Sequence, residues 1–569
     1  MDYRKEYEKW LESDYFDQAT TDELIAIKDD EKEIEDRFYK NLAFGTAGMR
    51  GKLGAGTNRI NVYMVRRATQ GLADYILKQG GKERGVAIAY DSRHFSDVFA
   101  KETALTFTAN GIKAYLFTSL RPVPVLSYAV RHLKTIAGVA ITASHNPKEY
   151  NGYKVYWEDG AQAVDEIADE IVASVNAIEN YDSLSVMDET EAIKKGLLEY
   201  IDKEVDDAYM ADIKTLSMAD GLPKDFRIIY TPIHGAGNVP VRRILDELGF
   251  DDVCVVKAQV EPDGDFPTVK APNPEDPAVF DLAIEYAKEK DAHIILGTDP
   301  DCDRLGLLVP DGKGGYIRLN GNQIGALLFD YILKAKAGGL PEKSVLIKSI
   351  VTGDITKHIA KKHGVKTYDV LTGFKYIGEM IEKMESTDET FIFGFEESYG
   401  YLMGAFARDK DAVVASMLAC EMAAYYKSIG KSIYEGLMDI YEEYGYYADG
   451  QIAVELDGKA GLDKIGRIMT AFRSEGFPKM PGIKETEAID YQNQTIRLME
   501  ADEVKSTGLR QSNVLKRVYD DRSWVTVRPS GTEPKIKVYV SACDKTLEGS
   551  EDKMKTLMNM MKKAMEQVD

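Results

Sequence analysis

Short apolar runs alternate with helical patterns along most of the chain, and this alternation most constrains its fold. Gly85–Tyr90 and Ala114–Thr118 have the composition of buried strands, and Val98–Asn110 between them has a helical pattern. Strands joined by helices in this order are typical of βαβ units and of largely parallel sheets. Similar α/β stretches begin near Phe226, after the acidic segment Glu199–Met218, which has a helical pattern, and near Val345. The sequence therefore predicts several α/β domains.

The C-terminal region has a different pattern, because strand-like runs there surround helical segments. These runs are Ile452–Leu456, Trp524–Val527 and Lys535–Val540. They predict a smaller α+β domain. At about 150 residues per domain, a chain of 569 residues is long enough for about four domains. We expect residues 1–205 to form an N-terminal extension and α/β domain I, 206–320 α/β domain II, 321–446 α/β domain III, and 447–569 α+β domain IV. Within the extension, charged and aromatic residues at helical spacing predict one or two surface helices in residues 1–40.

Composition narrows the class of protein. Hydrophobic residues make up 44% and charged residues 29%, no apolar run approaches a membrane span of about 18 residues, and the first residues lack a signal-peptide core. We therefore expect a cytoplasmic protein with no membrane partner. The four cysteines form no CxxC pair, which argues against a disulfide framework or structural zinc. A net charge of −22 argues against nucleic acid, and it requires any phosphate site to be locally basic or to hold a metal.

A serine follows one of the predicted buried strands. Gly138–Thr142 is apolar, and Ser144, His145 and then Asn146 and Pro147 come directly after it. Ligands of open α/β sheets bind at this carboxyl end of the strands. Ser144 could be a nucleophile there or a helix N-cap. No Gly-x-Ser-x-Gly motif is present, and adjacent side chains diverge, so His145 does not complete a hydrolase triad.

Three aspartates alternate in a second loop. Asp299, Asp301 and Asp303 follow the apolar run Ala292–Gly297, so an extended loop would place their carboxylates on one side. Oxygen ligands at this density favour Mg²⁺, while a solvated acidic turn and a calcium loop are the alternatives. The calcium reading lacks the later glycine and distal glutamate of an EF-hand. Arg304 could offer a phosphate two parallel donors, or it could lie on the surface.

Two further loops carry polar groups. Glu396, Glu397 and Ser398 follow Phe391–Phe395 and could bind sugar hydroxyls or simply end a strand. Nearby, Lys410 could be an acid, a base or an electrostatic group if burial lowers its pKa, or it could be a surface lysine. The loop at 528–534 combines an arginine, two hydroxyls and a glycine, which suits a phosphate, although a tight turn is the alternative.

With these four loops in this order, the chain resembles the α-D-phosphohexomutase superfamily, in the branch that contains phosphoglucomutases, phosphomannomutases and phosphopentomutases. The similarity runs from Gly45–Gly51 to the loop at 528. It implies four domains around a central cleft. Three of them would be related α/β domains with mixed sheets, and the last would be a smaller α+β domain.

The resemblance also implies roles for individual residues. Ser144 would be the phosphorylated serine, and it would bind Mg²⁺ together with Asp299, Asp301 and Asp303. The positions near the reacting group are Arg50, His145, Lys154, Arg304 and Lys410. The substrate-binding positions are Thr372, Gly373, Lys375, Glu396, Ser398, Arg528, Ser530, Gly531 and Thr532.

The implied activity is that of a phosphoglucomutase, which interconverts α-D-glucose 1-phosphate and D-glucose 6-phosphate through a phosphoserine enzyme. Glucose 1,6-bisphosphate would be the intermediate and an activator. Mannose or pentose phosphates are the near alternative substrates, while a metal-dependent phosphatase using Ser144 and a non-catalytic sugar-phosphate sensor are more distant readings. The sequence leaves the oligomeric state open.

One departure from many relatives lies in the metal loop, where Pro300 and Cys302 stand in place of glycines. Cysteine adds a soft sulfur, yet the three carboxylates keep Mg²⁺ the expected ion. Cys302 could be a small buried filler or, if its thiolate is accessible, a site of oxidation.

Overall fold

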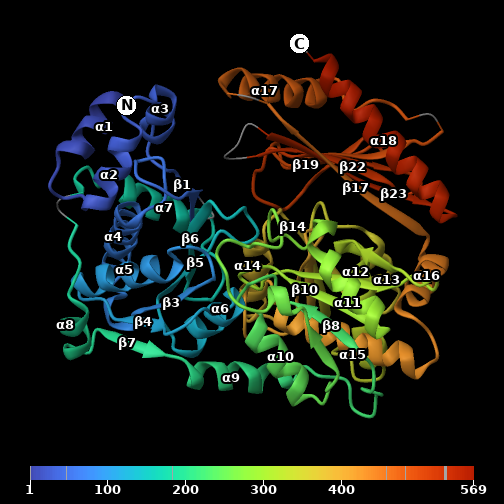
Figure 1. Cartoon of the computed structure of the whole chain (residues 1–569). Coiled ribbons are helices and arrows are strands. Elements are labelled where there is room, and N and C mark those ends of the chain that lie inside the picture. The colour runs from blue at the N-terminus through green and yellow to red at the C-terminus, as the bar shows by residue number, and fades with distance from the viewer. Residues whose placement is uncertain are drawn as a thin grey trace. The chain divides into compact units, whose positions relative to one another are not determined.

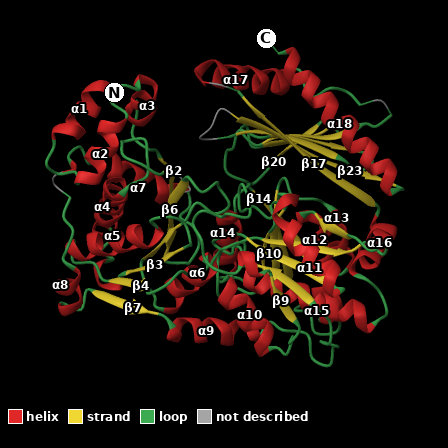
Figure 2. Cartoon of the chain, in the orientation of Figure 1, coloured by secondary structure: helices red, strands yellow, loops and turns green. Residues whose placement is uncertain are grey.

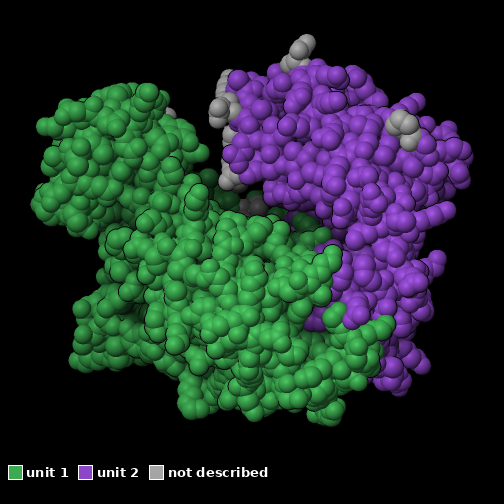
Figure 3. All heavy atoms as spheres, turned by 45° about the vertical axis from the view of Figure 1, so that its right-hand side comes forward, with its two compact units in different colours: residues 1–321, 374–432 green, residues 322–373, 433–569 purple. Residues whose placement is uncertain are grey.

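A computed structural model describes residues 2–45, 48–181, 184–456, 458–480, 482–530 and 535–568 (Figure 1). The chain divides into two compact units (Figure 3). The first unit comprises residues 1–321 and 374–432, and the second comprises residues 322–373 and 433–569. The sequence passes from the first unit to the second, returns, and passes to the second again.

The N-terminal extension forms three helices, one more than the upper limit that the sequence predicted. They are α1 (Tyr3–Glu12), α2 (Gln18–Ala26) and α3 (Glu31–Phe38). Asp2, Asp17 and Asp30 cap them by accepting hydrogen bonds from backbone amides of the first turns. Trp10 is fully buried and stacks on Phe16 with ring centroids 4.0 Å apart. An aromatic cluster therefore fixes this extension on the first α/β domain, whose core it joins.

The first α/β domain has a seven-stranded mixed sheet in the order β1-β2-β6-β5-β3-β4-β7, in which β5, β3, β4 and β7 are parallel. The strands are β1 (Phe44–Gly45), β2 (Gly48–Lys52), β3 (Val86–Tyr90), β4 (Ala114–Phe117), β5 (Ala137–Ile141), β6 (Tyr150–Trp157) and β7 (Leu198–Ile201). The helices are α4 (Val62–Lys78), α5 (Ser96–Ala109), α6 (Val123–His132), α7 (Asp165–Asn176), α8 (Glu189–Lys194) and α9 (Lys203–Lys214).

One local prediction in this domain is wrong. The acidic segment from Glu199 onward was expected to be helical, but its first residues form the edge strand β7, which pairs with β4. Isolated charge patterns do not show whether a neighbouring strand edge is available, and here that edge decides the conformation. The helical pattern holds from Lys203 as α9.

The second α/β domain has a five-stranded mixed sheet in the order β12-β11-β10-β8-β9. Its strands are β8 (Ile228–Thr231), β9 (Val253–Val255), β10 (Ile294–Thr298), β11 (Leu305–Pro310) and β12 (Tyr316–Leu319), and its helices are α10 (Asn238–Glu247) and α11 (Asp281–Lys290). The strands β10, β8 and β9 are parallel, whereas β11 runs back beside β10. The loop between β10 and β11 carries the three aspartates.

The next segment of the chain contributes to both units. In the second unit, β13 (Ser344–Ser349) pairs in parallel with β14 (Lys366–Val370), next to α12 (Gly321–Ala335), α13 (Ile355–Lys362) and α16 (Ile433–Tyr444). In the first unit, β15 (Thr390–Glu396) pairs antiparallel with β16 (Gly400–Leu402), next to α14 (Phe374–Met384) and α15 (Ala412–Ser428).

The C-terminal domain is α+β, as predicted, with an antiparallel sheet in the order β17-β23-β22-β21-β18-β19-β20. Its strands are β17 (Tyr446–Glu455), β18 (Glu485–Asp490), β19 (Thr495–Leu498), β20 (Glu503–Ser506), β21 (Leu515–Tyr519), β22 (Trp524–Pro529) and β23 (Lys535–Asp544). The helices α17 (Gly458–Ser474) and α18 (Leu547–Gln567) lie along one face of this sheet and share its core (Figure 2).

The fold class is therefore α/β with a C-terminal antiparallel-sheet domain. Within the described ranges, helices long and apolar enough to cross a membrane are absent.

Candidate active site

Ser144 lies in the loop that leaves the carboxyl end of β5, and its side chain faces the aspartate loop. Its Oγ donates to Asp299 Oδ2 at 2.9 Å and lies 3.1 Å from His145 Nδ1. The residue is only 4% exposed, and its backbone has a left-handed φ of 52°. The backbone amide of Ser144 donates to Thr142 Oγ1 at 2.8 Å, which supports this uncommon conformation.

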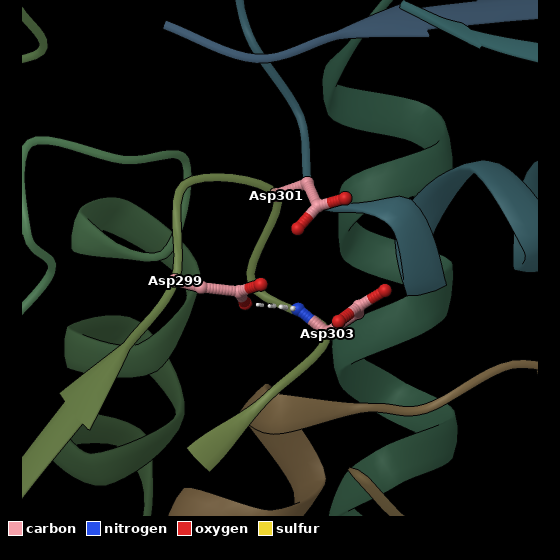
Figure 4. Close-up of side chains that lie close together, drawn as sticks. All are labelled: Asp299, Asp301 and Asp303. Carbon is pink, nitrogen blue, oxygen red and sulfur yellow. Dashed lines mark hydrogen bonds between the residues drawn. The ribbon is translucent and has the colours of Figure 1, made fainter. Parts of the chain in front are cut away.

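The three aspartates gather at the loop between β10 and β11 (Figure 4). Asp299, Asp301 and Asp303 are buried, and one carboxylate oxygen from each lies within 4.8 Å of the others. Asp299 Oδ1 also accepts the backbone amide of Asp303 at 3.1 Å. The Oδ1 atoms of Asp301 and Asp303 are buried without a hydrogen-bond partner among the described residues. Buried carboxylate oxygens without partners are costly unless an ion binds them, so the cluster fits a divalent cation.

The pKa values of Asp299 and Asp303 are shifted in opposite directions. Burial and the neighbouring Asp301 and Asp303 raise the pKa of Asp299 well above its usual range. Burial alone would also raise the pKa of Asp303, but Lys410 and Lys154 outweigh it, so that this pKa lies below its usual value.

Two lysines and an arginine surround the triad. Lys154 Nζ lies 2.8 Å from Asp301 Oδ2, and Lys410 Nζ lies 3.0 Å from Asp303 Oδ2. Arg304 Nη1 lies 2.6 Å from Glu275 Oε1, and the Arg304 backbone amide donates to Asp299 at 3.0 Å. Basic groups therefore gather around these carboxylates, although the chain as a whole is acidic.

The sequence-based condition for Lys410 as a base is not met, because its pKa is raised rather than lowered. Burial works to lower this pKa, but Asp303 and Asp409 outweigh it. Lys410 therefore keeps its proton and can act as an acid or as an electrostatic group. His145 is the opposite case, since burial and then Arg304 and Arg50 hold its pKa well below the usual range. Its imidazole is neutral.

Arg50 comes from β2, on the other side of the serine loop. Its Nη1 donates to Asn146 Oδ1 at 3.0 Å, and the arginine is otherwise exposed. The structure thus brings Ser144, His145, Arg50, Lys154, Arg304, Lys410 and the aspartate triad into one region of the first unit.

The loop after β15 lies beside the aspartate loop. Tyr399 accepts, through its backbone oxygen, a hydrogen bond of 3.0 Å from the amide of Leu305, at the start of β11. Glu396 is 6% exposed and Ser398 is half-buried, and Glu396 lies close enough to help raise the pKa of Lys410. Glu396 is therefore near the reacting region, and the binding of a sugar by Glu396 and Ser398 stays a prediction.

Lys375 forms an ion pair that the sequence did not indicate, and its role in sugar orientation stays a prediction. Its Nζ donates to Asp165 Oδ1, the first residue of α7, at 2.6 Å, and Tyr376 donates to Asp165 Oδ2 at 2.7 Å. The lysine charge is thus paired within the protein. Asp165 gave no signal in the sequence, because the two residues are 210 positions apart.

The other predicted substrate-binding residues belong to the second unit. Thr372 and Gly373 follow β14, and Gly373 has a φ of 125°. Arg528 and Ser530 lie at the end of β22, where the amide of Ser530 donates to Lys535 O at 2.7 Å and closes the loop. Gly531 and Thr532 lie outside the described residues.

Arg93 was not identified from the sequence, although it binds the backbone of the serine loop. Its guanidinium donates to four backbone oxygens, those of Ser144, Asn146, Pro147 and Tyr150. The side chain is fully buried, with Asp91 Oδ2 at 3.4 Å from its Nε. A signal existed, because Asp91 and Arg93 directly follow the predicted strand next to the serine strand.

Cys302 is buried, and burial raises the pKa of its thiol well above the usual value. The filler role expected for Cys302 is supported, since a thiolate is neither accessible nor favoured there.

Comparison with known proteins agrees with this geometry. The domains described as phosphoglucomutase/phosphomannomutase alpha/beta/alpha domains I, II and III and C-terminal domain match residues 41–182, 207–313, 320–444 and 452–554. A phosphoglucomutase of Staphylococcus epidermidis is 40% identical over 515 residues, covering 90% of this chain and 93% of the relative. The chain belongs to the phosphoglucomutase/phosphomannomutase family.

A second relative and a solved structure extend the comparison. A phosphoglucomutase of Staphylococcus aureus is 38% identical over 538 residues, covering 94% of this chain and 95% of the relative. The structure of pp63/parafusin, a phosphoglucomutase from Paramecium, aligns with a TM-score of 0.69 at 19% identity, over 93% of this chain and 95% of that one. At this identity the alignment shows the shared fold. As a phosphohexomutase, the chain is an isomerase that acts as an intramolecular phosphotransferase.

Proposed function

We propose that this chain interconverts α-D-glucose 1-phosphate and D-glucose 6-phosphate in the cytoplasm. The observation that carries the proposal is Ser144 Oγ, which lies 2.9 Å from a buried triad of carboxylates and beside a neutral histidine. Relatives named phosphoglucomutase, at 38–40% identity, favour glucose phosphates over the mannose and pentose alternatives. Transfer of a phosphoryl group depends mainly on positioning and charge neutralisation, and this region supplies both.

Ser144 is proposed to carry the phosphoryl group between two positions of the sugar. Phospho-Ser144 loses its group when the P–Oγ bond breaks and a bond forms from phosphorus to the free hydroxyl of the sugar monophosphate. His145, whose imidazole is neutral, would accept the hydroxyl proton, and Lys410 would stay protonated beside the transferring group. The product is glucose 1,6-bisphosphate. It turns around, and Ser144 then takes up the other phosphoryl group.

The metal would be held by Asp299, Asp301, Asp303 and Ser144. The two buried Oδ1 atoms without partners support this assignment, and oxygen ligands favour Mg²⁺. When bound, the ion supplies positive charge for the oxygens that carry charge during transfer. Lys154 and Lys410 pair with the Oδ2 atoms of Asp301 and Asp303, so the triad need not depend on the ion alone for charge compensation.

The remaining residues are proposed to bind the sugar phosphate. Glu396 would accept hydrogen bonds from sugar hydroxyls, and Ser398 would donate or accept them. Arg50 and Arg304 would attract the reacting phosphate. The non-reacting phosphate would lie at Arg528, Ser530, Gly531 and Thr532. Thr372, Gly373 and Lys375 would act on sugar orientation, and Lys375 must then exchange Asp165 for the substrate. The bisphosphate is also proposed as an activator, because it can phosphorylate an empty Ser144.

The domain boundaries 1–205, 206–320, 321–446 and 447–569 remain part of this proposal. They assign one loop to each domain: serine, metal, sugar and distal phosphate.

The test is Ser144→Ala, because Ser144 is the proposed nucleophile and its hydroxyl lies 2.9 Å from Asp299. We expect mutase activity to fall by at least about 10³-fold with an unchanged melting temperature. Thr142→Ser, which keeps the hydroxyl that supports the loop, is the matched control. Peptide mass mapping should find phosphate on Ser144 in the wild type after incubation with glucose 1,6-bisphosphate.

Turnover by Ser144→Ala at the wild-type rate would refute the proposal. Steady release of inorganic phosphate from glucose 1-phosphate would favour the phosphatase, and binding of sugar phosphate without any turnover by the wild type would favour the sensor. Parallel assays with mannose 1-phosphate and ribose 1-phosphate distinguish the substrate alternatives.

A further inference from the structure

Each of the two aspartates that flank Lys410 accepts a hydrogen bond from a buried tyrosine. Tyr156 Oη donates to Asp409 Oδ2 at 2.7 Å. Tyr209 Oη lies 2.9 Å and 2.8 Å from the two carboxylate oxygens of Asp411. Both tyrosines are fully buried and come from elements far from Lys410 in the sequence, β6 and α9. No step of the proposed reaction uses either hydroxyl.

Asp411 fixes the backbone on the C-terminal side of Lys410. Its Oδ1 accepts the amides of Val413 and Val414, both at 3.0 Å, and so caps α15. Its own amide donates to Tyr401 O at 2.8 Å. The next amide, that of Ala412, donates to the backbone oxygen of Cys302 in the metal loop at 3.3 Å. Asp411 therefore links the start of α15 to the loop that carries the triad.

Asp409 fixes the side chain of Lys410 itself. Lys410 Nζ lies 2.8 Å from Asp409 Oδ1 and 3.0 Å from Asp303 Oδ2, so the ammonium bridges the two carboxylates. The aliphatic part of Lys410 passes over Gly400, where an added Cβ would lie 2.2 Å from Lys410 Cδ. The lysine thus has a defined path, and its end point depends on where Asp409 is held.

Tyr156 lies on the same strand as Lys154 and contacts the aspartate that binds Lys410. Lys154 and Tyr156 are two residues apart on β6, so their side chains leave the same face of the sheet. Lys154 reaches Asp301 at 2.8 Å, while Tyr156 reaches Asp409 at 2.7 Å. The strand β6 therefore places Lys154 beside the triad directly and holds Lys410 beside it through Asp409. Burial and the facing aspartates raise the pKa of both tyrosines well above the usual value, so their hydroxyls stay protonated donors.

We propose that Tyr156 and Tyr209 are positioning residues for Lys410, whose ammonium they keep beside Asp303 by holding Asp409 and Asp411. This inference rests on the proposed function, in which Lys410 acts on the phosphoryl group or on the sugar hydroxyl. A lysine on a flexible four-carbon stem loses efficiency when its ammonium moves by about 1 Å, because such misplacement alone can cost about a hundredfold in rate. The cost of a displaced ammonium should appear in turnover, since each tyrosine hydroxyl donates to an aspartate beside Lys410 and not to a proposed substrate.

The experiment replaces each tyrosine by phenylalanine, which removes one oxygen and keeps the ring. For Tyr156→Phe and Tyr209→Phe we expect kcat with glucose 1-phosphate to fall about tenfold or more, while KM changes by less than about twofold. Tyr128→Phe is the matched control, because Tyr128 donates to Asp212 Oδ2 at 2.7 Å, packs against Tyr209 and has no link to Lys410. Its kcat should equal that of the wild type.

A double-mutant cycle separates positioning from general stabilisation. If the tyrosines act through Lys410, adding Tyr209→Phe to Lys410→Gln should lower the single-turnover rate no further, whereas independent effects would multiply. Multiplied losses, an effect confined to KM, or an equal loss in Tyr128→Phe would overturn the inference. Each hydroxyl holds a different aspartate, so either variant suffices if the other fails to fold. A wild type without mutase activity would instead refute the proposed function.

Discussion

At the scale of single residues, backbone strain occurs in three of the four loops that the proposed reaction uses. Ser144, Cys302 and Tyr399 have φ values of 52°, 52° and 68°, in the left-handed region that side chains other than glycine seldom adopt. Each conformation is held by neighbours, as when the Ser144 amide bonds Thr142. Strain of this kind persists where surrounding structure enforces it, which is common at functional sites.

Arg93 gives the first residue-scale prediction. Arg93→Met should lower the free energy of unfolding by about 3–5 kcal/mol, because it leaves buried carbonyl oxygens without donors and Asp91 without its counter-charge. The surface arginine Arg84 also donates to two backbone oxygens, so Arg84→Met is a matched control, with an expected loss below about 1 kcal/mol. Urea unfolding measures both. Equal losses in the two variants would show that the buried clamp has no special weight.

Candidate site residues could be predicted from the sequence only where several polar or charged side chains lie close together in one loop. The aspartate triad and Ser144 lie together, as their positions after predicted strands indicated. Partners of single charges could not be predicted. Asp165 pairs with Lys375 across 210 residues, and the tyrosines that hold Asp409 and Asp411 are 253 and 202 residues away from them. Such pairs depend on tertiary packing, which leaves no local pattern.

At the scale of elements, short apolar runs predicted strands correctly, because a buried strand requires apolar side chains. The predicted strands at Gly85, Ala114 and Trp524 correspond to β3, β4 and β22. The edge strand β7 was missed, since an edge is selected by its neighbour rather than by its own residues. Helices were predicted for residues 1–40, but their number, three, and the aromatic core that holds them could not be determined without the structure.

The strand β21 carries a buried lysine that predicts a pH effect on stability. Lys516 donates to Ile350 O at 2.9 Å within the second unit, and burial, with nearby Lys357 and Lys348, lowers its pKa to about 8. The unfolded chain takes up a proton near its usual pKa of about 10.5, whereas the folded protein does so only near 8. Stability from this group is therefore present above pH 10.5 and is lost as the pH falls towards 8.

Lys516→Met removes this dependence. Relative to the wild type, the variant should lose about 2 kcal/mol of unfolding free energy as the pH rises from 7.5 to 10. Urea unfolding at both pH values measures the difference. Lys505→Met, at an exposed position of β20 in the same sheet, is the surface control. An unchanged difference between Lys516→Met and wild type at the two pH values would contradict a depressed lysine pKa.

At the scale of the whole molecule, the predicted functional residues are divided between two units. The serine, metal and sugar loops belong to the first, whereas Thr372, Gly373, Arg528 and Ser530 belong to the second. The number of domains and the α+β character of the last one followed from sequence patterns, and the first, second and last domains each bury a core of their own. The division into units could not be predicted from the sequence. The chain enters the second unit twice, and local sequence patterns do not indicate where a chain returns to an earlier unit.

The proposed binding residues of the non-reacting phosphate lie in the second unit, and Arg528 tests this proposal. Arg528 is proposed to bind the phosphate that does not react, so its interaction is equal in the ground state and the transition state. Arg528→Met should therefore raise KM for glucose 1-phosphate by about tenfold and change kcat by less than about threefold. Arg497→Met is the control, because Arg497 belongs to the same sheet and pairs with the exposed Asp502 at 2.6 Å. A loss confined to kcat would instead assign Arg528 to the reacting group.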